Sequence, residues 1–61
     1  MENEKEIVVL LRRNSDGLTI TDIVKKSRFS RSTIRTILAR LEGGHKVKVK
    51  TIGMAKLYSL K

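Results

Sequence analysis

The sequence predicts a mainly α-helical fold, with three helices followed by a C-terminal β-hairpin. Apolar residues recur at helical spacing in three segments before residue 43, whereas valine and lysine alternate with a period of two after residue 45. Gly43 and Gly44 separate the two patterns, and glycine after a helical run is a typical stop signal. The chain of 61 residues is long enough for one small domain, which we predict to span residues 1–61.

The first helix is predicted over residues 2–13. Glutamates in its first turn and arginines in its last turn complement the helix dipole. Ile7, Leu10 and Leu11 form the inward stripe, and Val9 points nearly the opposite way. Val9 therefore packs beneath the C-terminal strand, stands exposed, or contacts a second subunit, and the sequence alone does not separate these alternatives.

The second helix is predicted over residues 19–26, after a turn at residues 14–17. Thr19 is placed to cap the helix, and Asp22 three residues later completes an acidic form of the capping box. Phe29, the only phenylalanine, lies between two apolar helix faces, so we expect it in the core rather than stacked on a nucleic-acid base.

The third helix is predicted over residues 30–42, with Ser30 as its N-cap. Its apolar stripe follows the i, i+3, i+4, i+7 spacing of one helix face, with the members Ile34, Ile37, Leu38 and Leu41. The opposite face is small, hydroxylated and cationic, and is formed by Ser32, Arg35, Thr36, Ala39 and Arg40. Solvated faces usually mix charges of both signs, so this face is predicted to lie against a polyanion.

The hairpin is predicted over residues 45–61, with a bend at residues 51–53. Valines and lysines alternate along its first strand, which gives one apolar and one cationic face. We expect a lysine-rich outer face, with three lysines near the tip, namely Lys48, Lys50 and Lys56. His45 is interpreted as a turn or strand-start residue, with a phosphate contact as the alternative.

Charge is distributed unevenly along the chain. The net charge is +8, but residues 1–22 hold three basic and five acidic side chains, whereas residues 23–61 hold eleven basic and one acidic. One strongly basic half is typical of a nucleic-acid-binding protein. A generally soluble basic protein is the plainer alternative, but solubility does not require this asymmetry.

Several classes of function are not expected. The chain has no cysteine and one histidine, which argues against a disulfide or a metal centre. Neither a catalytic triad nor a glycine-rich phosphate loop is present, so we expect no enzyme and no cofactor. The sequence has no segment long enough for an extra helix or effector pocket, so we expect no small-molecule ligand. No apolar run reaches membrane-spanning length and no signal peptide is evident, so a cytoplasmic, nucleoid-associated location in a cell without a nucleus is expected.

A family resemblance follows from the order of these elements. It is carried by the runs Thr19-x-x-Asp22-Ile23-Val24, Phe29-Ser30-Arg31-Ser32-Thr33-Ile34, Leu38-x-x-Leu41-Glu42, Val47 and Tyr58-x-Leu60. Residues 19–42 resemble a helix-turn-helix, and the whole chain resembles the winged helix-turn-helix domain of small bacterial and archaeal repressors of the MarR and ArsR type. Two positions depart from that pattern, since Arg28 stands where glycine is common and Val24 where alanine is common.

The resemblance implies that the third helix enters the major groove of DNA and that the hairpin reaches the flanking backbone or minor groove. The residues expected to reach the duplex from the third helix are Ser30, Arg31, Ser32, Thr33, Arg35, Thr36 and Arg40. Ser30, Ser32 and Thr33 are placed at the helix N-terminus, where free N–H groups favour a phosphate. Arg35 is the best candidate for a bidentate contact to guanine, and Lys48, Lys50 and Lys56 are expected on phosphates.

Apolar residues left over after the core is filled predict a homodimer. Val9 and Leu57 lie on the first and last elements and are the predicted interface, which would present two recognition helices to neighbouring half-sites. Three functions remain open at this stage: a sequence-specific transcription regulator, a sequence-tolerant architectural protein, and a winged helix used for protein or RNA binding. Arginines on the third helix favour the first.

Overall fold

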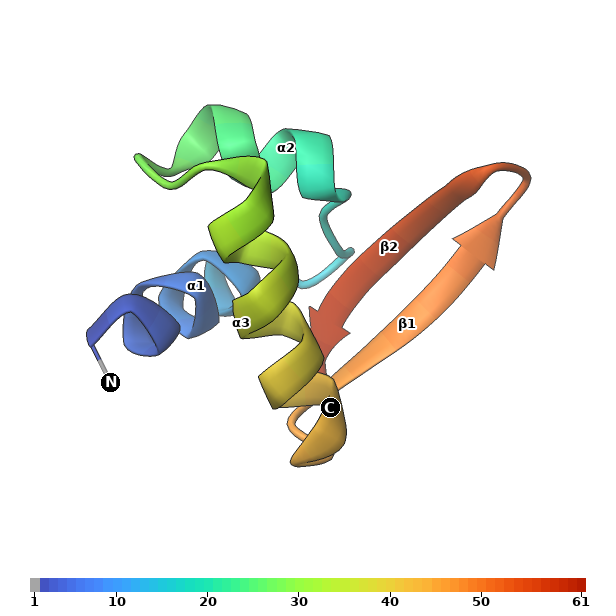
Figure 1. Cartoon of the computed structure of the whole chain (residues 1–61). Helices are drawn as coiled ribbons and strands as arrows, with labels where there is room; N and C mark the ends of the chain where they lie inside the picture. The colour runs from blue at the N-terminus through green and yellow to red at the C-terminus, as the bar shows by residue number, and fades with distance from the viewer. Residues whose placement is uncertain (1) are drawn as a thin grey trace.

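The computed structural model describes residues 2–61 and contains three helices and two strands. In chain order these are α1 (Glu2–Arg13), α2 (Ile20–Lys26), α3 (Arg31–Gly43), β1 (Val47–Ile52) and β2 (Ala55–Leu60). The strands form one antiparallel hairpin that extends away from the helices (Figure 1). The predicted fold class, mainly α with a C-terminal hairpin, is confirmed. None of the described helices is both long and apolar enough to cross a membrane.

A single cluster of buried apolar side chains holds the elements together. Its members are Ile7, Leu11, Leu18, Ile23, Ile34, Ile37, Leu38, Leu41 and Val47. Helix α3 supplies four of them, which is the complete predicted stripe of that helix. Phe29 is half-buried and packs against this cluster, as predicted, while Arg28 lies over its ring at 5.5 Å from the centroid.

Side-chain caps fix where α2 and α3 begin. The hydroxyl of Thr19 accepts the N–H of Asp22 at 3.1 Å, and the Asp22 carboxylate accepts the N–H of Thr19 at 3.2 Å, so the predicted capping box is present. The hydrogen bond that the Thr19 backbone donates to the carboxylate is the largest cause that holds the pKa of Asp22 below its usual 3.8, and the Thr19 side chain adds to it. At α3, the Ser30 hydroxyl accepts the N–H of Thr33 at 3.2 Å, as expected for an N-cap.

Helix α3 ends at the glycine pair, as predicted, but the left-handed residue that follows the helix lies beyond this pair. Gly43 is still helical, and it is His45 that takes the left-handed conformation, with φ of 58°. The N–H of His45 donates to the Glu42 carbonyl at 3.0 Å, and the N–H of Lys46 donates to the Leu41 carbonyl at 2.8 Å. These two bonds are those of a Schellman motif, in which the left-handed position usually holds glycine.

The turn of the hairpin also lies later than predicted. Strand β1 continues through Ile52, which pairs with Ala55, so the turn consists of Gly53 and Met54 instead of residues 51–53. Gly53 has φ of 59° and Met54 does not have a positive φ, which fits a type II′ turn with glycine at its first central position.

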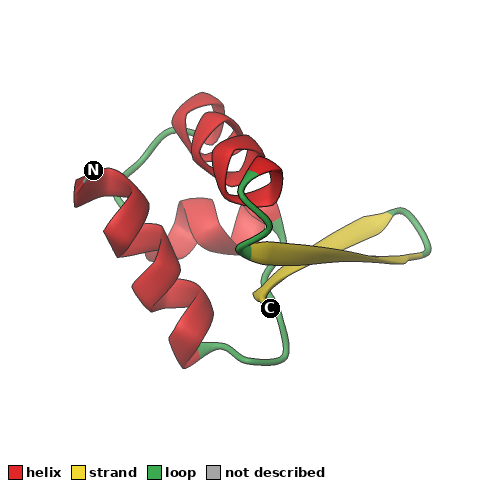
Figure 2. Cartoon of the chain, turned by 90° about the horizontal axis from the view of Figure 1, so that it is seen from below, coloured by secondary structure: helices red, strands yellow, loops and turns green. Residues whose placement is uncertain are grey.

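The base of the hairpin is attached to the connection between α1 and α2. Leu18 and Tyr58 exchange two backbone hydrogen bonds, of 2.9 and 2.8 Å, so Leu18 forms a single bridge at the edge of the sheet. Beside it, Gly17 has φ of 101°, and a Cβ at that position would lie 3.2 Å from the Cβ of Leu57. Beyond this attachment the hairpin projects from the helices as a thin ribbon (Figure 2).

Candidate nucleic-acid interface

The surface of α3 opposite the core is the first part of the candidate interface. Its exposed residues before the last turn, here called the α3 outer face, are Arg31, Ser32, Arg35, Thr36, Ala39 and Arg40, and Glu42 and Gly43 are exposed at the end of the helix. Because the other side of this helix is buried in the core, the direction of these side chains is fixed by packing. The face is cationic and hydroxylated, as the sequence predicted.

Arg35 differs from the other arginines of this face in having no partner. Its guanidinium makes no hydrogen bond and no ion pair within residues 2–61. Arg31, in contrast, donates to the Thr21 hydroxyl of α2 at 3.2 Å. Thr36 donates its hydroxyl hydrogen to the carbonyl of Ser32 at 3.2 Å, which orients that side chain along the helix. Arg35 can therefore contact a ligand without first breaking a hydrogen bond or ion pair within the domain.

Arg40 lies on the side of α3 that faces α1. It lines a small recess together with Glu4 of α1 and with Thr33 and Thr36 of its own helix. A carboxylate in that recess attracts cations and repels phosphates. The α3 outer face therefore has one edge near α2, where Arg31 lies, and a partly enclosed edge near α1, where Arg40 lies.

The hydroxyl residues at the start of α3 divide into two groups. Ser30 and Thr33 belong to the cap, because the Ser30 oxygen accepts the Thr33 N–H and lies 3.1 Å from the Thr33 hydroxyl oxygen. The N–H of Thr33 is thus already used within the helix, although it was expected to be open to a phosphate. Ser32 is exposed on the α3 outer face.

The hairpin, here called the wing (residues 47–60), is the second part. Lys48 pairs with Ser59 and Lys50 pairs with Leu57, so both lysines stand on the face turned away from the core side chain of Val47. Lys56 pairs with Thr51 and therefore lies on the other face. Lys48 and Lys50 therefore form the predicted lysine-rich face, while Lys56 lies on the opposite face of the ribbon.

The wing tip, defined as residues 52–54, carries a feature that the sequence reasoning treated only as leftover apolar surface. Met54 is fully exposed, and Ile52 is 53% exposed. Gly53 between them has no side chain. Apolar residues in a lysine-rich turn were the available signal, but the position of the turn was needed to show that they form its apex.

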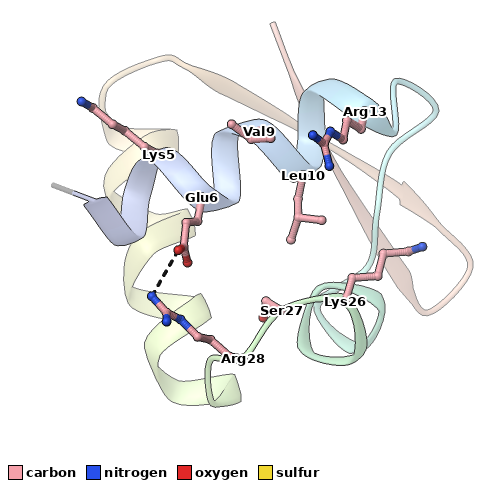
Figure 3. Close-up of a pocket in the computed structure, with 8 residues that line it drawn as sticks. All are labelled: Lys5, Glu6, Val9, Leu10, Arg13, Lys26, Ser27 and Arg28. Carbon is pink, nitrogen blue, oxygen red and sulfur yellow. Dashed lines mark hydrogen bonds and ion pairs between the residues drawn. The ribbon is translucent and has the colours of Figure 1, made fainter.

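A separate groove lies between α1 and the end of α2, and Figure 3 shows its lining. Val9, 41% exposed, and Leu10 provide apolar surface there, and Glu6 pairs with Arg28 at 3.1 Å across the groove. The remaining charged side chains of the lining are cationic, namely Lys5, Arg13 and Lys26. Leu57, the other residue of the predicted dimer interface, is not part of this lining and lies half-buried beside Gly17.

Three helices followed by an antiparallel hairpin give a winged-helix-like topology. No protein-family model, curated protein or solved structure matches the chain. Among the described side chains, no group of three or more histidines or carboxylates is placed to hold a metal ion. The case for function therefore depends on the charge, exposure and placement of the residues described above.

Proposed function

We propose that this chain binds double-stranded DNA sequence-specifically and is a transcription regulator in the nucleoid of a bacterial or archaeal cell. The α3 outer face is placed in the major groove, and the lysines of the wing contact the flanking backbone. The observation that carries this proposal is the state of Arg35, which is exposed and without a partner on a helix held by four buried residues.

The chemistry of that arrangement supports base readout. A guanidinium is planar and offers two parallel N–H donors, which match the O6 and N7 acceptors of guanine in the major groove. Arg31 and the lysines supply charge to phosphates, which fixes register but carries no base preference. The excess of basic side chains in residues 23–61 places this charge on the half of the chain that contains α3 and the wing.

A second candidate is a sequence-tolerant architectural protein of the same fold. It is favoured by one observation, the exposed apolar side chains of the wing tip, which base readout by α3 does not require. A winged helix that binds protein or RNA remains the third reading, but the α3 outer face presents no large apolar side chain that would favour a protein partner.

Selection of bound duplexes from a random pool, read at two salt concentrations, tests the proposal. Neutralising about four to six phosphates per subunit gives a log–log salt slope of about −4 to −5 for duplex DNA. Enrichment of one motif supports a regulator, whereas equal enrichment of all sequences supports the architectural reading. A slope shallower than about −2 removes duplex DNA as the main partner.

The homodimer stays a prediction, and the cationic side chains around Val9 make its expected stability depend on salt. Two copies joined through this face would bring their cationic side chains Lys5, Arg13 and Lys26 together. We therefore expect dimerisation to strengthen as salt screens this repulsion. Sedimentation equilibrium on the wild type, Val9→Glu and Leu57→Glu, at low and high salt, tests this. A wild type that stays monomeric at about millimolar concentration with a palindromic duplex contradicts the dimer.

A further inference from the structure

We propose that the wing tip is an apolar wedge: Met54, with Ile52 beside it, inserts between adjacent base pairs from the minor groove and kinks the duplex. This inference rests on the proposed DNA binding and adds to it a mechanical effect on the bound duplex. Apolar side chains that enter the minor groove in this way partly unstack one base step and bend the helix towards the major groove.

The shape of the tip suits insertion. The turn has only two residues, and because Gly53 has no side chain, Met54 is the side chain at the apex. A two-stranded ribbon fits the major groove of B-DNA, whereas the minor groove is only about 6 Å wide, so only the end of the turn, with the Met54 side chain at its apex, enters it. Methionine is unbranched and flexible, which lets it enter a narrow gap between stacked bases.

Exposure of these side chains is not explained by folding. Residues 50–56 are all exposed, and the nine-member core contains none of them. Met54 is the most exposed large apolar side chain of the described chain, and water contact with such a side chain is unfavourable. Covering Met54 and Ile52 between bases would remove this apolar surface from water, which offsets part of the cost of unstacking.

Charge next to the tip favours a nucleic-acid occupant. Lys50 stands on the same face of the ribbon as Ile52, and Lys56 stands on the opposite face, close to Met54 in a recess with Thr19 and Thr21. When the tip of the wing enters the minor groove, one phosphate backbone lies on each side of it. The two lysines therefore lie on the sides from which both backbones can be reached, an arrangement that a single cationic face would not provide.

Base steps differ in how easily they unstack, so the wedge predicts a sequence preference away from α3. Pyrimidine–purine steps such as TA and CA are the most readily kinked. We expect such a step at the position of the wing tip, offset from the motif that α3 selects. This preference would appear although no polar side chain of the tip reads a base edge.

Fluorescence energy transfer across a short duplex labelled at both ends, with a central TA step, tests the bend. The wild type is expected to shorten the end-to-end distance by a kink of about 20–90°, and a 2-aminopurine at the step should brighten as it unstacks. Met54→Ala should lose both signals while still binding the duplex with nearly the same salt slope. The matched control Lys50→Ala should bind more weakly but bend each bound duplex as the wild type does.

The outcomes separate the wedge from DNA binding itself. Saturable binding of the wild type without any change in energy transfer or 2-aminopurine emission overturns the wedge and leaves the proposed function intact. Equal bending by Met54→Ala also overturns it, as does Met54-dependent binding to anionic phospholipid vesicles while the duplex stays straight. No saturable binding to any duplex overturns the proposed function, and the wedge with it. Because Met54 is fully exposed, its replacement does not disturb the core.

Discussion

Helix α3 and the wing both carry cationic side chains outward, but they are built in opposite ways. Four residues of α3 are buried, and the helix is capped at its start by Ser30 and closed at its end by a Schellman motif. The wing contributes one buried residue, Val47 at its base, and every residue from 50 to 56 is exposed.

This difference indicates how the two regions would divide the work of binding. Base readout needs donors held within a fraction of an ångström of their acceptors, which requires a helix fixed by packing. The minor groove varies in width and deformability with sequence. An element that contacts phosphates along it therefore does not need to be held as rigidly as a helix that reads bases. The rigid region is therefore suited to sequence preference, and the loosely held region to affinity and DNA shape.

The largest effect expected from this comparison is on stability. Ile34→Ala removes a fully buried side chain of α3 and is expected to cost about 2–5 kcal/mol of unfolding free energy. For a domain this small, such a loss approaches complete unfolding. Ile52→Ala is the matched control on the wing and should change stability by less than about 0.5 kcal/mol. Urea denaturation followed by circular dichroism measures both, and equal losses would mean that the wing tip is packed after all.

A smaller effect separates the two regions in binding. Arg35→Ala should cost about 1–3 kcal/mol on the preferred site and flatten the preference at one base position. Lys50→Ala should weaken all sequences alike and lower the magnitude of the salt slope by about one. Arg13→Ala, which removes a cation from the groove between α1 and α2, controls for the change in net charge. Equal losses for Arg35→Ala and Lys50→Ala on every sequence would remove direct readout by α3.

Local patterns predicted most of the helical part of this fold. The caps at Thr19 and Ser30 and the stripe of α3 depend on residues within one or two helical turns, and the structure has them where the sequence indicated. The α3 outer face follows from the same periodicity. The surroundings of the two edges of this face do not follow from the periodicity. The partner of Arg31 on α2 and the carboxylate of Glu4 beside Arg40 come from other elements.

Features that depend on contacts between distant segments were not predicted. The bridge between Leu18 and Tyr58 joins residues forty positions apart, and nothing near Leu18 in the sequence indicates a strand. The turn at Gly53 and Met54 is set by register with β2, and a shift of register moves side chains between faces. The position of the turn therefore decided which residues form the tip of the wing.

The junction between the two regions gives the smallest predicted effect. His45 is left-handed at the end of α3, because the chain must reverse there before Val47 enters the core two residues later. That conformation costs a non-glycine residue about 1–2 kcal/mol, and the greater freedom of glycine in the unfolded chain offsets part of any gain. His45→Gly is therefore expected to stabilise the domain by about 0.5–1 kcal/mol, which would raise Tm by about 3–6 °C.

A second substitution tests whether the left-handed residue of this junction is His45 or lies within the glycine pair. Gly43 is helical, and a Cβ there would meet no atom within 4 Å, so Gly43→Ala should also stabilise the domain, through higher helix propensity, by up to about 1 kcal/mol. If Gly43 provided the left-handed stop, the same change would destabilise the domain instead. Because neither residue touches the core, both variants should bind duplex DNA with the wild-type affinity and salt slope. A lower Tm for His45→Gly would show that the histidine side chain stabilises the junction between the rigid helix and the wing.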